Sequence, residues 1–221
     1  MPLKLRLPII YPITSGTTSL QAPTDDILRL VRAAVDSEVP LFQIREKSLS
    51  GRVLFELAAH AAEITRGSKT RLLVNDRSDI ACASGADGVH LTTQSLPVDV
   101  VRNTFGAEFL IGVSTHSLEE ARVAQDAGAD FVVFGPVFET ESKRGYGEPQ
   151  GLEKLGEVTH ALGEFPVVAI GGITLENVGD CFRAGARGVA AIRMLIDAEQ
   201  LSSIARAIRS KFGQDSQDFS R

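Results

Sequence analysis

The feature that most constrains this chain is an alternation, repeated eight times, of a short apolar run with an amphipathic helical segment. Short apolar runs are typical of buried strands, and apolar residues spaced three and four apart are typical of helices that cover them. The predicted strands are residues 7–14, 41–45, 72–74, 88–91, 109–114, 131–134, 166–170 and 188–192. The predicted helices start at residues 24–26 and then occupy 54–65, 80–84, 98–105, 118–127, 152–162, 175–184 and 198–212.

Strands that alternate with helices favour an α/β fold with a parallel sheet and helical crossovers. Eight such units are the number that closes a (β/α)8 TIM barrel. Every break in the pattern is short, so we predict a single (β/α)8 barrel domain over residues 1–221, with a polar C-terminal tail from about residue 213. A doubly wound open sheet is the alternative at this stage.

Composition excludes several classes of protein. Acidic residues number 28 and basic residues 23, giving a net charge of −5, which argues against a nucleic-acid partner. The apolar runs are too short to span a membrane, and the first residues do not resemble a signal peptide. We expect Cys82 and Cys181, which have no metal-ligand spacing, to be buried small residues in a reducing cytosol. The expected location is therefore the cytoplasm.

Polar residues recur at the C-terminal ends of five predicted strands. In order along the chain these residues are Arg45, Lys47, Asn75, Asp76, Ser114, Thr140, Ser142, Lys143, Gly171 and Gly172. In a closed barrel those ends meet on one face, where active sites are built. Cations, hydroxyls and glycine amides together suit an anion such as phosphate. We therefore predict one shared site for anionic ligands.

Chemistry suggests a role for three of these residues. Arg45 can grip a phosphate with its rigid fork, and Lys47 can add a mobile charge, the alternative being ion pairs with Glu46 or with helix residues. Asp76 is the best candidate for a Mg²⁺ ligand, because hard cations bind carboxylate oxygens and bridge phosphates. The alternative for Asp76 is that it caps the following helix.

The glycines and histidines leave more than one interpretation open. Gly171 and Gly172 let backbone amides approach a phosphate closely, or they form a tight turn, and the two roles are compatible. His90 lies in a predicted strand, and a satisfied core histidine is favoured over a ligand. His116, at a predicted helix start, can cap the helix or contact a substrate. No Ser-His-Asp order and no cysteine metal cluster is evident.

Five runs in register resemble thiamin phosphate synthase, from about residue 11 to residue 196. They are QIREK at 43–47, VNDR at 74–77, GADGVHL at 85–91, IGVSTHS at 111–117 and AIGGIT at 169–174. This family consists of (β/α)8 barrels that join hydroxymethylpyrimidine diphosphate to a thiazole phosphate. The products are thiamin phosphate and diphosphate. The resemblance implies both phosphorylated heterocycles as small-molecule substrates and Mg²⁺ as cofactor, and a homo-oligomer is compatible with it.

The resemblance also implies a role for each matching position. Gln43, Arg45, Lys47 and Asn75 would hold the pyrimidine diphosphate, Asp76 would bind Mg²⁺, and Ser114 and Lys143 would contact the diphosphate. Thr140, Ser142, Gly172 and the Ile192-Arg193 end of the last strand would bind the thiazole phosphate. Of these, Arg45, Lys47, Ser114 and Lys143 are the implied catalytic residues. In the family, loss of diphosphate leaves a pyrimidine carbocation that the thiazole nitrogen captures.

The chain departs from the family pattern at several positions. Ser95 stands where the family usually has a second Mg²⁺ carboxylate, and a neutral hydroxyl binds Mg²⁺ more weakly. Arg193 stands where a serine is common, and Thr14-Ser15 replaces Thr-Asp at the end of the first strand. The run at 138–143 also resembles the sister thiazole tautomerases, which usually have a catalytic histidine at the position of Pro136.

Three functions follow in order of preference. Gln43, Lys47 and Pro136 favour the synthase. Ser95 and the 138–143 run favour a thiazole tautomerase of the same pathway. Loss of the second carboxylate is also compatible with a non-catalytic binder of thiamin phosphates.

Overall fold

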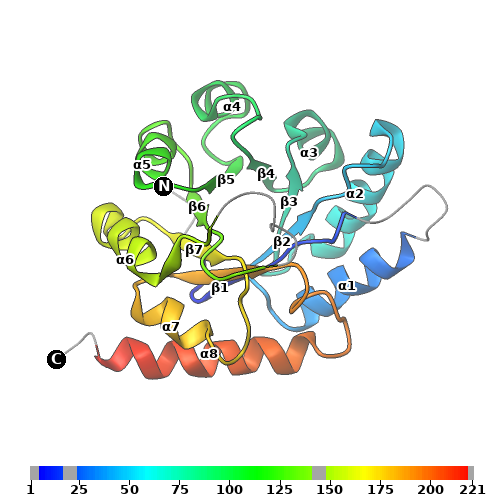
Figure 1. Ribbon diagram of the computed structural model, residues 1–221. Coiled ribbons are helices and arrows are strands. Elements are labelled where there is room, and N and C mark those ends of the chain that lie inside the picture. The colour runs from blue at the N-terminus through cyan, green and yellow to red at the C-terminus, as the bar shows by residue number, and fades with distance from the viewer. Residues whose placement is uncertain (1–4, 17–23, 141–147, 219–221) are drawn as a thin grey trace.

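The computed structural model describes residues 5–16, 24–140 and 148–218, and these form eight strands that alternate with eight helices (Figure 1). The strands are β1 (Ile9–Pro12), β2 (Leu41–Ile44), β3 (Arg71–Asn75), β4 (Gly88–Leu91), β5 (Leu110–Thr115), β6 (Phe131–Phe134), β7 (Val167–Ile170) and β8 (Gly188–Ala191). The helices are α1 (Asp25–Asp36), α2 (Gly51–Thr65), α3 (Ser78–Ser84), α4 (Val98–Phe105), α5 (Leu118–Asp126), α6 (Gly151–Leu162), α7 (Val178–Arg183) and α8 (Leu201–Asp218).

The sheet is a parallel barrel. Its strand order is β1-β8-β7-β6-β5-β4-β3-β2, and the seven pairs of neighbours in this order are all parallel. The remaining gap, between β1 and β2, is bridged just beyond β1, where Ile13 pairs with Gln43 and the Thr14 amide donates to the Gln43 carbonyl at 3.1 Å. The predicted (β/α)8 barrel is therefore confirmed, and the open doubly wound sheet is excluded.

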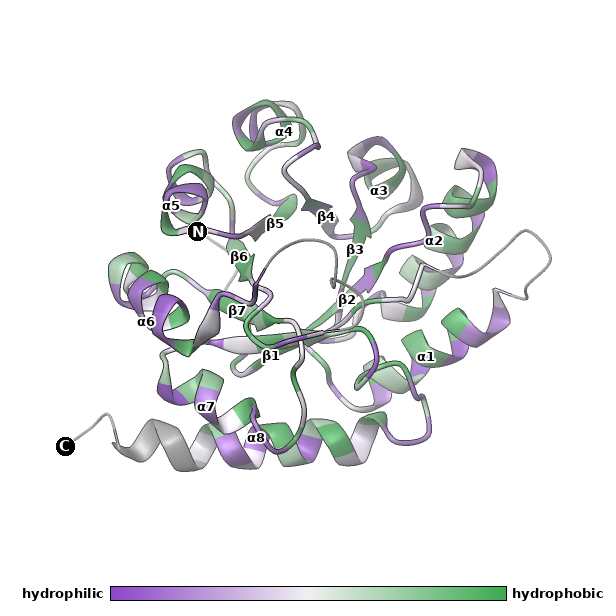
Figure 2. Cartoon of the chain, in the orientation of Figure 1, coloured by the Kyte–Doolittle hydropathy of each residue, from purple (hydrophilic) through white to green (hydrophobic). Residues whose placement is uncertain are grey.

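Two apolar layers hold the barrel together. Alternate residues of each strand point into the barrel or out toward the helices, because successive side chains on a strand face opposite sides. The inward layer is a small cluster that includes Tyr11, Leu73 and Phe131. The outward layer is much larger and packs the strands against the helices, whose apolar residues face the sheet while their outer faces are polar (Figure 2).

Gly112 of β5 shows how tightly the inner layer is filled. A Cβ atom at this position would lie 2.3 Å from the ring of Phe131 on the neighbouring strand β6. Only a residue without a side chain leaves room for that ring at the barrel axis. The Phe131 ring in turn meets the ring of Tyr11 edge-on, with centroids 5.6 Å apart. The interior below the barrel mouth is thus packed by side chains, as is usual for this fold.

Helix α8 continues to Asp218, so the first residues of the polar tail predicted from about residue 213 are helical. A helix that is anchored by packing in its earlier turns can propagate through polar residues at little cost. Cys181 is buried as expected, but Cys82 is exposed on α3. Within the described part of the chain, no helix is long and apolar enough to cross a membrane.

Candidate active site

The guanidinium group of Arg45 lies over the C-terminal end of β1. The Arg45 amide donates to Oγ1 of Thr14 at 2.8 Å, and Nη1 donates to the carbonyl oxygen of Ser15 at 3.4 Å. The buried carboxylate of Glu46 accepts from the amide of Gly16 at 3.2 Å. These bonds fix the segment after β2 against the segment after β1. Arg45 is thereby placed at the barrel mouth, and the neighbouring Lys47 is exposed to solvent.

Asp76 follows β3, the strand next to β2, and its side chain is exposed. Its backbone has φ of 63°, in the left-handed region that few non-glycine residues adopt. The Asp76 amide donates to the carbonyl of His90 at 2.9 Å, and the Arg77 amide donates to the carbonyl of Asn75 at 2.8 Å. Helix α3 has no side-chain cap at its N-cap residue, Arg77, so the structure does not support a capping role for Asp76. A strained backbone at a strand end is typical of functional sites.

The described residues do not contain a complete set of protein ligands for a metal ion. Across residues 5–16, 24–140 and 148–218, no group of three or more His, Cys, Asp or Glu side chains could hold a metal ion. The hydroxyl of Ser95 accepts from the Thr92 amide at 2.7 Å and lies 3.1 Å from Oγ1 of Thr92, so it is part of a turn. Mg²⁺ is commonly bound through one or two carboxylates together with substrate phosphates and waters. The exposed carboxylate of Asp76 fits Mg²⁺ in that way.

A second part of the mouth is formed by the loop after β7. Gly171 and Gly172 have φ of 98° and 64°, so both require the conformational freedom of glycine. The amide of Phe138 donates to the carbonyl of Gly171 at 3.0 Å, and a Cβ atom on Gly172 would lie 2.5 Å from the carbonyl oxygen of Glu139. The loops after β6 and β7 are therefore in direct backbone contact. The tight turn that was one alternative for these glycines is present.

Asn177, which is not among the site residues predicted from the sequence, holds this loop in place. Its side-chain Nδ2 donates to the carbonyl of Gly172 at 2.9 Å, and its Oδ1 accepts from the amide of Thr174 at 2.8 Å. Both backbone groups would otherwise need other partners at the start of α7. The sequence pattern that could have predicted this role is an asparagine three residues after a threonine and just before a helix.

The loop after β6 also meets the end of β8. Nη2 of Arg193 lies 3.3 Å from Oγ1 of Thr140. Ile192, the preceding residue, packs against the inner apolar cluster. Ser142 and Lys143 lie outside the described residues, so their predicted roles stay predictions. The structure thus brings Thr140, Gly172 and the 192–193 segment to one side of the mouth.

Beneath the mouth, polar side chains from four strands form hydrogen bonds. Nε2 of Gln43 donates to Oη of Tyr11 at 2.8 Å, Oη lies 3.3 Å from Nδ1 of His90, and Nε2 of His90 lies 2.9 Å from Oγ of Ser114. His90 is buried and satisfied, as predicted. Burial, and then the nearby charge of Arg45, lowers the pKa of His90 from 6.5 to about 3. Burial also raises the pKa of Tyr11 above its usual value.

His116 lies beside α5 and interacts with it. Both its amide and its Nδ1 atom lie close to Oε2 of Glu120, at 2.7 Å and 3.2 Å, while Ser117 Oγ accepts from the amide of Glu120 at 3.1 Å. This reciprocal arrangement is a variant of a helix capping box. The structure therefore favours the capping role that was one of two alternatives for His116.

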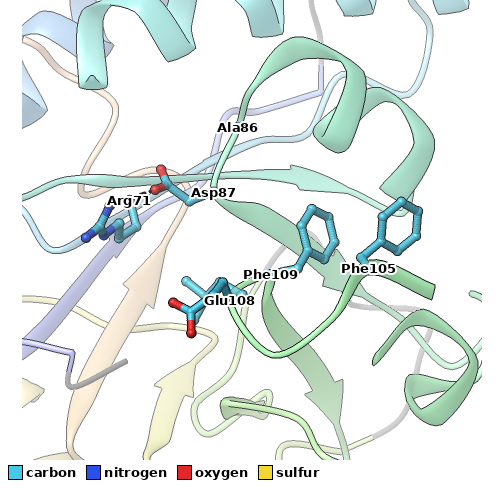
Figure 3. Close-up of a pocket in the computed structure, with 7 residues that line it drawn as sticks. Arg71, Ala86, Asp87, Phe105, Glu108 and Phe109 are labelled. Carbon is cyan, nitrogen blue, oxygen red and sulfur yellow. Dashed lines mark hydrogen bonds and ion pairs between the residues drawn. The ribbon is translucent and has the colours of Figure 1, made fainter. Parts of the chain in front are cut away.

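A separate hollow of about 400 Å³ lies at the opposite end of the barrel (Figure 3). Its lining residues are Arg71, Ala86, Asp87, Phe105, Glu108, Phe109 and Leu110. Arg71 and Asp87 are paired with each other at 2.8 Å, and the rings of Phe105 and Phe109 stack at 4.8 Å. The N-terminal ends of the strands carry stability rather than catalysis in this fold. We therefore assign the candidate site to the mouth and not to this hollow.

Comparisons with known proteins identify the family of this chain. Residues 10–195 match the model of a family described as thiamine monophosphate synthase. The chain belongs to the thiamine monophosphate synthase family. A putative thiamine-phosphate synthase of Geobacter sulfurreducens is 44% identical over 188 residues, which cover 85% of this chain and 88% of the relative. A thiamine-phosphate synthase of Moorella thermoacetica is 41% identical over 182 residues, which cover 82% and 86%.

Solved structures support the same family. A thiamine phosphate pyrophosphorylase from Pyrococcus furiosus superposes with a TM-score of 0.77 at 29% identity, covering 93% of this chain and 96% of that chain. The family predicted from the five sequence runs is therefore confirmed. The synthase, rather than the tautomerase or a binder without activity, is the function that these thiamine monophosphate synthase family members support.

Proposed function

We propose that this chain is a Mg²⁺-dependent thiamin phosphate synthase that joins hydroxymethylpyrimidine diphosphate to thiazole phosphate. The observation that carries the proposal is the presence at one barrel mouth of two sets of groups that suit phosphates, the first of which combines a cation with a carboxylate that can hold Mg²⁺. Arg45 and Asp76 follow the adjacent strands β2 and β3, while Thr140, Gly172 and Arg193 gather after β6, β7 and β8. Two phosphorylated substrates need two such sets, with the reacting atoms between them.

The chemistry requires charge stabilisation more than acid or base catalysis. The bond between the pyrimidine methylene carbon and the diphosphate oxygen breaks, and its electron pair leaves with the diphosphate. The lone pair of the thiazole nitrogen then forms the new carbon–nitrogen bond, and no proton has to move. Arg45, Lys47 and the Ser114 hydroxyl stabilise the negative charge that develops on the leaving diphosphate. Thr140, Gly172 and Arg193 hold the second phosphate and so position the thiazole ring.

The proposed metal site uses the carboxylate of Asp76. A bound Mg²⁺ would neutralise charge on the diphosphate and so make it a better leaving group. Asp76 is the only residue that we assign to the metal, so the remaining ligands would come from the substrate and from water. We expect relatively weak Mg²⁺ binding in the absence of the diphosphate substrate.

The direct test is an assay of the purified chain with both substrates and with or without Mg²⁺. We expect thiamin phosphate to form only with Mg²⁺, and Arg45→Ala to lower kcat/KM by at least about tenfold, because hydrogen bonds to charged groups contribute roughly 1.5–3 kcal/mol. Lys154→Ala, which alters an exposed residue on α6, is the matched control. No product at high enzyme concentration would reject the proposal. Turnover of the thiazole carboxylate phosphate tautomer instead would identify a tautomerase.

We further propose a cytoplasmic enzyme, in agreement with the absence of a membrane-spanning helix in the described ranges. Light scattering on the purified chain decides whether it is a homo-oligomer.

A further inference from the structure

A row of hydrogen-bonded polar side chains leads from the barrel interior to its mouth. It consists of Gln43 on β2, Tyr11 on β1, His90 on β4 and Ser114 on β5. The first three are almost fully buried, with exposed fractions of 1%, 0% and 3%, and Ser114 is half-buried. The partners are 24 to 79 residues apart in sequence, so the closed barrel alone brings them together.

The donors and acceptors in this row can be assigned from chemistry. The amide nitrogen of Gln43 can only donate, so Tyr11 Oη accepts at 2.8 Å. The single proton of the Tyr11 hydroxyl is then directed to Nδ1 of His90 at 3.3 Å, which must be unprotonated. A neutral imidazole carries one N–H, so the proton of His90 is on Nε2 and is donated to Ser114 Oγ at 2.9 Å.

This order leaves one direction for the proton of Ser114. Because Oγ accepts from His90, its own hydroxyl proton points away from His90. Ser114 lies one residue before the C-terminal end of β5 and is the least buried member of the row, so it is the member nearest the mouth. Arg45 directly follows the C-terminal end of β2, so its cationic side chain belongs to the same end of the barrel.

We propose that His90 is a positioning residue, which fixes the Ser114 hydroxyl as a donor toward the diphosphate of the substrate. The inference rests on the proposed function for the identity of the anion, but not for the order of the hydrogen bonds. A donor that is already oriented needs no reorganisation when charge develops on the leaving group. Neither His90 nor Tyr11 touches the substrate in this scheme. Both act through Ser114.

Burial keeps the row in this order. Both His90 and Tyr11 are almost fully buried, and a charged ring there would lose its hydration, so burial favours the neutral form of each side chain. A protonated imidazole would donate from both nitrogens and could not accept from the Tyr11 hydroxyl. The ring contacts of Tyr11 with His90, at 5.7 Å, and with Phe131 also restrict both rings sterically.

The first test reads the tautomer of His90 directly. We would label the histidines of the full chain with ¹⁵N and record ring-nitrogen spectra at pH 7.5, using His90→Gln to identify the signal of His90. We expect a neutral ring with its proton on Nε2. A proton on Nδ1, or an imidazolium, would overturn the proposal. The result does not depend on enzymatic activity, so it remains decisive if the proposed function fails.

The second test measures coupling between Tyr11 and Ser114. Tyr11→Phe keeps the ring that packs against Phe131 and removes only the hydroxyl. We expect Tyr11→Phe to lower kcat by about tenfold with little change in the KM for thiazole phosphate, and Ser114→Ala to lower it at least as much. The double variant should be no slower than Ser114→Ala alone, because the two residues act as a unit. Losses that multiply in the double variant would overturn the proposal.

Two further variants separate positioning from packing. His90→Gln retains an N–H group that can reach Ser114 and should keep more activity than His90→Leu. Equal losses in both would contradict a hydrogen-bonding role. Phe131→Leu alters the apolar contacts of Tyr11 and His90 but removes none of the hydrogen-bonding groups of the row, so its effect should multiply with that of Ser114→Ala. Thermal unfolding of each variant shows that the comparison is made on folded protein.

Discussion

Nη2 of Arg193 lies 3.3 Å from Oγ1 of Thr140, which joins the end of β8 to the loop that follows β6. Arg193 donates this hydrogen bond and Thr140 accepts it, and the guanidinium, the hydroxyl and the Gly172 amide are all groups that can donate to a phosphate dianion. We predict that Arg193→Ala raises the KM for thiazole phosphate by at least about tenfold while kcat changes little, since a charged hydrogen bond contributes roughly 1.5–3 kcal/mol. Arg206→Ala, on the exposed face of α8, is the control. An unchanged KM would place the phosphate elsewhere.

Gly172 should tolerate no side chain. A Cβ atom would lie 2.5 Å from the carbonyl of Glu139, and the φ of 64° disfavours any L-residue with a side chain. We predict that Gly172→Ala displaces the loop after β6, weakens thiazole phosphate binding and lowers the melting temperature. Gly156→Ala, in helix α6, is the matched control, because a Cβ atom there meets nothing within 4 Å. This variant should raise the free energy of unfolding by about 0.5–1 kcal/mol. Similar behaviour of the two variants would refute the explanation.

Ser95 replaces a carboxylate that the family usually has, and its hydroxyl accepts from the Thr92 amide at 2.7 Å. An aspartate can accept the same hydrogen bond with one oxygen and leave the second for a cation. If Ser95 faces the metal, Ser95→Asp should lower the Mg²⁺ concentration that gives half-maximal activity several-fold. Ser95→Asn adds an oxygen of similar reach without the charge and is the control. An unchanged Mg²⁺ requirement in both variants would show that Ser95 does not face the metal.

The barrel was predictable because its signal is local. Each buried strand is a short apolar run, and the helix that follows has its own periodicity, so the pattern survives errors of a few residues at element ends. One larger discrepancy is informative. Helix α7 begins at Val178 and not at 175, because the side chains of Thr174 and Asn177 bind backbone groups of the preceding loop. Polar side chains that compete with the helix for backbone groups delay its start.

The hydrogen-bonded row below the mouth was not predictable in the same way. Tyr11 lies in a short strand that Pro8 precedes and Pro12 ends, and nothing near it in sequence indicates partners 32 and 79 residues away. Those contacts depend on how the barrel closes and on which residues of β1, β2 and β4 point inward at the same height. The positive φ of Asp76 is likewise a tertiary property that its sequence neighbours do not reveal.

Thr115 offers a stability test that is independent of function. Its Oγ1 is buried and, among the described residues, has no hydrogen-bond partner. A buried hydroxyl without a partner costs about 1–3 kcal/mol of desolvation. We predict that Thr115→Val, which has nearly the same shape, raises the free energy of unfolding by about 1 kcal/mol in urea titrations. Thr65→Val, which removes a buried hydroxyl that does donate to the Ala62 carbonyl, should have the opposite sign. Loss of stability in Thr115→Val would reveal a partner for this hydroxyl.

The buried imidazole of His90 should make the fold sensitive to mild acid. Its pKa is about 3 in the folded chain and near its ordinary value of 6.5 when unfolded. Between these values the unfolded chain binds a proton that the folded chain does not, so stability is complete above pH 6.5 and is lost as the pH falls toward 3. The linkage relation gives a loss of about 2 kcal/mol between pH 7 and pH 5.

Urea unfolding at pH 7 and at pH 5, with EDTA present, measures the loss of stability that is due to His90. His90→Gln has no imidazole at this position but keeps every other ionisable group, so it should lose about 2 kcal/mol less than the parent chain over the same interval. Groups that act equally in both proteins cancel in this comparison. Identical pH dependence in the two proteins would mean that water reaches His90 and that its charged form is tolerated in the barrel.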